Sequence, residues 1–160
     1  MNWKMSRIVR TVADVLLVPI VIFGIYLIVH GHLTPGGGFQ GGAVVASSMA
    51  LLIAAYGALG HHKGDLSSLE STGLTIFIVL AFLGLGTTVF YNFLAGSGSL
   101  FGGTVSDQVS NPGYINTGGT VTLMNIAVGM EVTAALSLIL WMMAKKSGSI
   151  DVKEDKEVEK

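Results

Sequence analysis

The most unusual chemical group in this sequence is a carboxylic acid, Glu131, near the middle of an apolar stretch from Met124 to Met143. An ionised acid in hydrocarbon costs several kcal/mol, so such a group pairs with a cation, holds a proton or faces water. Ala127 and Ala135 lie one helical turn away on either side and leave room for water or for a basic residue of a partner. Glu131 is therefore the first candidate for an ion route. The alternative is a neutral acid that is hydrogen-bonded inside the protein.

Small and polar residues form a second stripe on the same stretch, at four-residue spacing. The stripe consists of Asn125, Gly129, Thr133 and Ser137. Residues at this spacing share one face of a helix. Asn125 and Thr133 are therefore further candidates for a hydrated ion path.

Asp14 is the acid of the first apolar stretch, and it follows Arg10 by one helical turn. This spacing allows an ion pair near the membrane surface, which is the favoured interpretation, and Asp14 stays a weaker candidate for the ion path.

Histidines and cysteines give no indication of a metal or cofactor. His30 and His32 follow the first apolar stretch and His61 and His62 follow the second, so the pairs would lie about one bilayer apart and could not share a haem. The chain has no cysteine. We therefore predict no metal site, no cofactor and no catalytic residue.

The amino-acid composition indicates whether the segments that carry these groups lie in water or in a membrane. Of 160 residues, 51% are hydrophobic and only 12% are charged, and the mean hydropathy is +0.67. A formal charge of -1 offers no electrostatic attraction to nucleic acid. These values exclude an ordinary soluble enzyme, a disordered chain and a nucleic-acid-binding protein. They predict an all-α integral membrane protein.

Four apolar stretches are long enough to cross a hydrocarbon core about 30 Å thick. They run from about Ile8 to Val29, Gly41 to Leu59, Leu74 to Phe93 and Met124 to Met143. The predicted fold is a bundle of four transmembrane helices with Gly-rich outer loops. The long loop from Ala95 to Thr120 is expected to pack on another subunit.

All nine Lys and Arg residues lie before the first stretch, between the second and third, or after the fourth. Loops near basic residues stay in the cytoplasm, which places both termini inside a multi-pass protein of the cell membrane. Residues 1–145 are expected to form the transmembrane domain, and residues 146–160 a charged cytoplasmic tail.

A Gly-rich string joins the first two stretches and predicts a tightly packed hairpin, because glycine permits unusual backbone angles and close helix contacts. Its members are His32, Pro35, Gly36, Gly37, Gly38, Phe39, Gly41 and Gly42. A stripe of small residues follows in the second stretch, at Gly42, Ala46, Ala50, Ala54 and Ala58. This stripe suits close packing, either on a helix of the same chain or on a foreign subunit.

The string from Gly31 to Gly42 resembles the Gly-His-x-x-Pro-Gly-Gly-Gly-Phe-x-Gly-Gly signature of the MrpB/MnhB-type subunit of multisubunit cation/proton antiporters. The resemblance extends over about residues 5 to 145. It implies a small subunit that assembles with other membrane subunits into a module exchanging Na+ and H+. The same module occurs in membrane-bound hydrogenases and related sulfur-reducing complexes. One departure is that Asn125 stands where antiporter members often carry an acid, whereas the acid here is Glu131.

The resemblance therefore implies a mainly structural membrane subunit that contributes to the ion route through Glu131. Such a subunit is no enzyme by itself, although it can belong to a redox-driven ion-pumping complex. Two alternatives remain at this point. One is a free-standing proton-coupled transporter that acts as a homo-oligomer, and the other is an assembly scaffold without ion contact.

Overall fold

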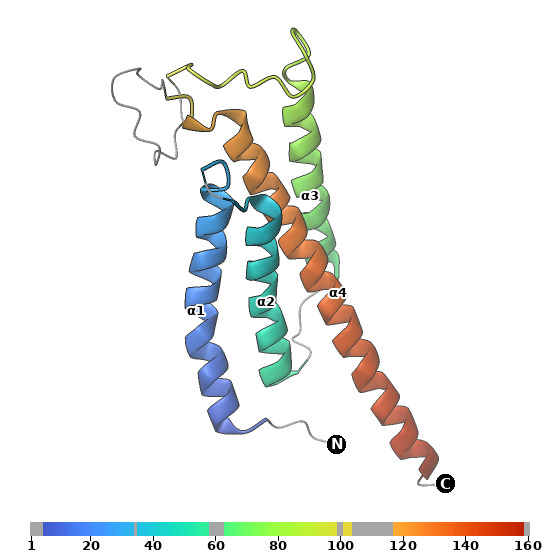
Figure 1. Cartoon of the computed structure of the whole chain (residues 1–160). Coiled ribbons are helices and arrows are strands. Elements are labelled where there is room, and N and C mark those ends of the chain that lie inside the picture. Colours follow the sequence, from blue (N-terminus) through green and yellow to red (C-terminus); the bar gives the residue numbers. More distant parts are fainter. Residues whose placement is uncertain (1–4, 34, 58–62, 99–100, 104–116, 159–160) are drawn as a thin grey trace.

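The computed structural model describes residues 5–33, 35–57, 63–98, 101–103 and 117–158, with side chains up to Lys146 except that of Lys63. In this part of the chain the regular structure is entirely helical: α1 (Arg7–Val29), α2 (Gly38–Tyr56), α3 (Lys63–Phe82) and α4 (Thr120–Val158). All four helices are long and apolar enough to cross a membrane. The predicted all-α membrane fold with four spans is confirmed (Figure 1).

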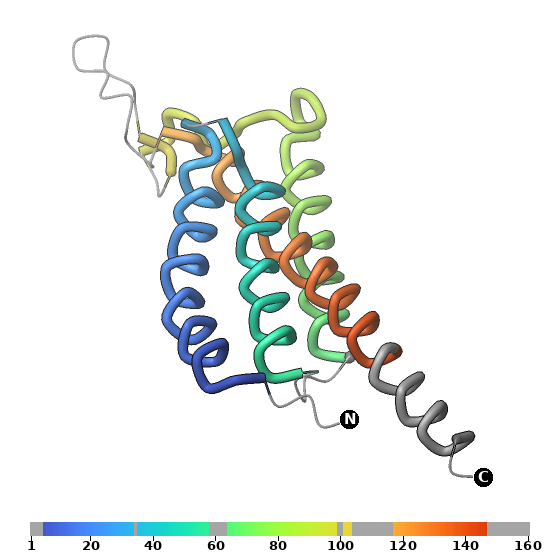
Figure 2. Tube along the Cα trace, turned by 60° about the horizontal axis from the view of Figure 1, so that its bottom comes forward, coloured from blue at the N-terminus to red at the C-terminus, as the bar shows by residue number. Residues whose placement is uncertain are grey.

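The helices form a row in the order α1, α2, α4, α3 rather than a closed square. α1 packs on α2, α2 on α4, and α4 on α3, while α1 touches α4 only slightly. Figure 2 shows α4 passing between the α1–α2 pair and α3. Successive helices run in opposite directions, so the start of α1 and the end of α4 lie at the same end of the molecule. α4 therefore contacts all three other helices.

The first two helices agree closely with the sequence prediction. α1 begins after Ser6, whose Oγ accepts a hydrogen bond from the Val9 N–H, as a helix cap does. α2 begins at Gly38, three residues earlier than expected, after Gly37 with a φ of 132°. It ends at Tyr56 instead of Leu59, because Gly57 adopts a φ of 82° that other residues rarely take.

The third helix lies eleven residues earlier than predicted, at Lys63–Phe82 instead of Leu74–Phe93. Its polar first half stays helical because four hydroxyls donate to carbonyls one turn back in the same helix, which satisfies them without water. These hydroxyls belong to Ser68, Ser71, Thr72 and Thr75. The helix stops before Gly84, and the chain folds back so that the Phe90 N–H donates to the Ala81 carbonyl. Asp65 and Glu70 therefore lie within α3, although the predicted third stretch begins only at Leu74.

α4 begins at Thr120, four residues before the predicted start, because Asn92 caps it from the loop that follows α3. Asn92 Oδ1 accepts hydrogen bonds from the Thr120 N–H at 2.8 Å and from the Thr120 hydroxyl at 2.9 Å. The part of α4 that suits a membrane is Thr120–Lys146. The helical backbone continues to Val158, through the segment expected as a tail. The division into a 1–145 domain and a 146–160 tail stays a prediction.

Candidate functional site: an acidic contact between α3 and α4

Gly73 sets the distance between α3 and α4 at the depth of Glu131. A methyl group on Gly73 would lie 2.8 Å from the Ala127 carbonyl oxygen and 2.9 Å from the Glu131 nitrogen. A residue without a side chain is therefore required where the two helices touch. This contact fixes Glu131 directly beside α3.

Glu131 is half-buried at this contact. The part of the chain that the structure describes gives its carboxylate no hydrogen bond and no ion pair. Ala127, expected to leave room beside it, is only 1% exposed, because α3 fills that side. Ala135, on the other side of Glu131, is half-buried. The carboxylate can therefore reach a partner or water only along the remaining open side of the contact.

Glu70 is a second acid at the same contact, and the sequence reasoning missed it. It lies one helical turn before Gly73 and is half-buried. Like Glu131, it makes neither a hydrogen bond nor an ion pair with any residue described. In the sequence, the spacing of Leu66, Glu70, Gly73 and Phe77 indicates one face of a helix, and this is the face of α3 that packs on α4.

Asn125 and Thr133, the two other ion-path candidates of α4, lie against α2 and the hairpin instead. The Thr133 hydroxyl is 2.6 Å from the Gly129 carbonyl oxygen and 3.3 Å from the Gly42 carbonyl oxygen, so it bonds within α4 and to α2. The Asn125 side chain fills the space beside Gly31. The structure therefore separates these residues from Glu131, which turns towards α3. Whether any of them contacts an ion stays a prediction.

The hairpin is an internal packing element, since its glycines touch other helices of the same chain. Gly38 lies against the Asn125 carbonyl oxygen and Val128 of α4, and a methyl group on Gly41 would come within 2.5 Å of Ile28 of α1. Gly42, the first residue of the small stripe, lies against Gly129 and Val132 of α4.

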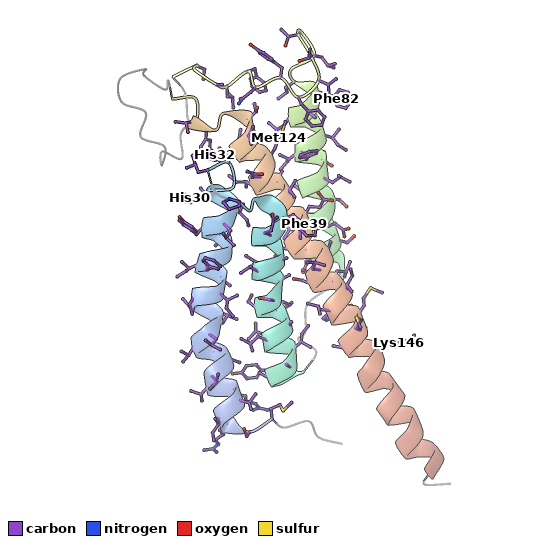
Figure 3. The ribbon with its side chains drawn as sticks, in the orientation of Figure 1. His30, His32, Phe39, Phe82, Met124 and Lys146 are labelled. Carbon is purple, nitrogen blue, oxygen red and sulfur yellow. The ribbon has the colours of Figure 1, made fainter. Side chains whose placement is uncertain are left out.

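The hairpin residues other than glycine differ from one another in burial. Phe39 is 61% exposed and Pro35 is exposed. His32 Nδ1 lies 3.3 Å from the Thr122 hydroxyl of α4, while His32 Nε2 is buried without a partner. Figure 3 shows His30, His32 and Met124 at the hairpin end of the molecule and Lys146 towards the opposite end.

Asp14 belongs to a third location, at the end of α2 that lies away from the hairpin. It accepts a hydrogen bond of 2.6 Å from the Tyr56 hydroxyl, and the Arg10 guanidinium lies over the Tyr56 ring at 5.3 Å from its centre. Tyr56 therefore links the two charged residues that the sequence spacing had paired directly. Among the described residues, no three His, Asp or Glu side chains come together as a metal site would need.

Comparisons with known proteins agree with the resemblance noted from the hairpin. Residues 8–138 match the family described as a domain related to the MnhB subunit of Na+/H+ antiporter. The chain is 33% identical over 144 residues to an uncharacterized protein of Methanocaldococcus jannaschii, covering 87% of this chain and 52% of that protein. It is 37% identical over 78 residues to a Na+/H+ antiporter subunit of Bacillus subtilis, covering 49% of each chain. These alignments span about half the length of both relatives.

Two further comparisons cover most of the chain. A putative antiporter subunit mnhB2 of Staphylococcus aureus is 29% identical over 82% of this chain and 92% of its own length. A chain in the structure of the membrane-bound sulfane sulfur reductase, an archaeal respiratory membrane complex, matches with a TM-score of 0.73 and 25% identity. That match covers 89% of this chain and 60% of the other. This multi-pass helical chain therefore belongs to the family of domains related to the MnhB subunit of Na+/H+ antiporter.

Proposed function

We propose that this chain is a membrane subunit of a Na+/H+ antiporter module, either in a stand-alone antiporter or in the ion-translocating arm of a hydrogenase or sulfur-reducing complex. The family membership and the relatives named as antiporter subunits support this function. The likeness to a chain of a respiratory membrane complex supports the second setting. The free-standing transporter is not favoured, because the relatives from Bacillus subtilis and Staphylococcus aureus are named as subunits.

The role of the chain in this module is mainly structural, with Glu131 as its contribution to the ion route. The observation that carries this role is a half-buried carboxylate at mid-helix, without a partner in the described chain, where α3 and α4 touch. Such a group exchanges a proton or attracts a cation more readily than one already held by hydrogen bonds. The chain has no catalytic step of its own in this proposal.

The test is Glu131→Gln in the complex purified with all its subunits. Glutamine keeps the size and the hydrogen bonding of the side chain but removes the charge and the exchangeable proton. We expect normal subunit composition, with Na+-dependent or proton-dependent exchange in proteoliposomes reduced by at least about tenfold. Unchanged exchange over the working pH range would contradict a place on the ion route.

The matched control is Asp65→Asn, which removes one carboxylate from the exposed first turn of α3. This change leaves the α3–α4 contact intact, so transport should stay close to that of the parent complex. Purification of the chain without any other membrane subunit would contradict the proposed module itself.

A further inference from the structure

Glu70 and Glu131 lie on the same side of the α3–α4 pair. Glu70 precedes Gly73 by three residues and is therefore rotated by about 60° from it around α3. On α4, the centre of the contact with α3 falls between Ala127 and Glu131. Viewed along its own helix, Glu131 is rotated from this centre in the same direction as Glu70 is rotated from Gly73. Because the two helices run in opposite directions, equal senses of rotation bring both carboxylates to one side of the contact.

The two sides of the contact differ in burial along α4. On the side away from Glu131, Ala127 and Ala134 are at most 1% exposed. On the side of Glu131, Ile139 is 53% exposed and Met142 is 48% exposed. On α3, Leu74 next to Glu70 is 46% exposed. On the side of the carboxylates, the described part of the chain thus leaves apolar side chains uncovered.

We propose that this surface is the docking site for a transmembrane helix of a neighbouring subunit, and that this helix carries a Lys or Arg side chain that pairs with Glu70 and Glu131. The inference rests on the proposed function, since it needs a neighbouring membrane subunit. It deepens that function by naming where the neighbour binds and by which chemistry.

Charge complementarity is the argument for this occupant. Two acids in the span of one helix pair, with no partner in the described part of the chain, are costly in lipid and repel each other when ionised. A single basic side chain between them would offset both effects, whereas lipid tails offer neither charge nor hydrogen bonds. Leu74, Ile139 and Met142, further along the same side of the two helices, provide the apolar contact that a membrane helix requires.

The test is site-specific cross-linking in the complete complex. The chain has no native cysteine, so Ile139→Cys and Leu74→Cys each provide a single attachment point for a photoreactive probe. Val15→Cys, at a 67% exposed position on α1, is the control on a different helix. We expect the first two probes to cross-link to one and the same subunit, at a transmembrane peptide with an intramembrane Lys or Arg. The Val15 probe should not reach that peptide.

A Glu70→Gln, Glu131→Gln double variant then tests the charge pairing. Its yield of the Ile139 cross-link should fall by about tenfold, which corresponds to about 1.4 kcal/mol of lost interaction. Cross-links to lipid, to a second copy of this chain, or to a helix without Lys or Arg would overturn the inference. So would an unchanged yield in the double variant.

These failures are distinguishable from a failure of the proposed function. If the chain purifies with its other subunits but its probes find no basic helix, only the docking site is wrong. If the chain purifies without other membrane subunits, the antiporter-module function fails and the docking site fails with it.

Discussion

At the scale of single residues, the polar groups of α4 divide into two kinds according to the helix they face. Glu131 faces α3 without a partner among the described residues, whereas the Thr133 hydroxyl is bonded to the carbonyls of Gly129 and Gly42. A hydroxyl held in this way joins two helices rather than offering oxygen to an ion. Sequence spacing alone puts these residues on neighbouring faces of one helix, and only the packing of α2 and α3 separates their surroundings.

The replacement Thr133→Val tests this division, because valine keeps the shape of threonine but removes the hydroxyl. We expect ion exchange in proteoliposomes to stay close to that of the parent complex. Losing one such hydrogen bond costs about 1 kcal/mol, so the thermal stability of the complex should fall only slightly. Loss of exchange at full stability would instead place Thr133 on the ion path beside Glu131.

At the scale of elements, the hairpin before α2 acts as a spacer whose glycines permit backbone contact with α4. Gly38 lies against the Asn125 carbonyl oxygen, and Val128 Cβ would be 2.9 Å from a methyl group on Gly38. The contacted atoms belong to the backbone and to a branched side chain, which cannot rotate away. Even an alanine would therefore force α2 away from α4.

We accordingly expect Gly38→Ala to lower the amount of assembled complex while the chain still inserts into the membrane, because insertion depends only on hydrophobicity. Gly86→Ala is the matched control, since a methyl group there meets no atom within 4 Å. Native gel electrophoresis of solubilised membranes measures assembly, and alkaline extraction measures insertion. Equal assembly of both variants would show that the hairpin is a loose connector.

The sequence predicts the positions of some helices better than those of others. α1 and α2 are continuous apolar runs, so their positions followed from hydropathy within three residues. α3 was misplaced because its first half is rich in Ser and Thr, whose hydroxyls are satisfied inside the helix and thus carry little cost in lipid. The predicted helix extends to Phe93 because the residues after Phe82 are mostly apolar, but Gly84 and the turn to Phe90 interrupt this apolar run. Because the predicted range of α3 begins at Leu74, it leaves out Glu70, whereas the predicted range of α4 includes Glu131.

The whole molecule is a row of helices with two open edges rather than a closed bundle. α2 and α4 each pack between two other helices, while α1 and α3 form open edges. Large apolar side chains remain exposed along both edge helices, among them Ile22, Val15, Leu74 and Val79. Lipid can cover such surfaces, but the two acids beside the α3–α4 contact require a polar neighbour. The shape thus agrees with a subunit of a larger assembly.

The orientation of this row in the membrane provides the last prediction. Four crossings put the start of α1 and the end of α4 on one side, and Arg7, Arg10, Lys145 and Lys146 lie at that end. The loop after α3 contains no Lys or Arg. Basic residues resist translocation, so we expect the loop to lie outside and both termini inside.

A membrane-impermeant maleimide tests this orientation in a chain that has no cysteine of its own. Ser97→Cys, in the loop after α3, should react in intact cells. Met5→Cys, before α1, should react only after the membrane is permeabilised. Both positions are exposed in the structure, so a difference in labelling reports the side of the membrane rather than burial. The reverse labelling pattern would show the opposite topology, with the hairpin and the start of α4 on the cytoplasmic side.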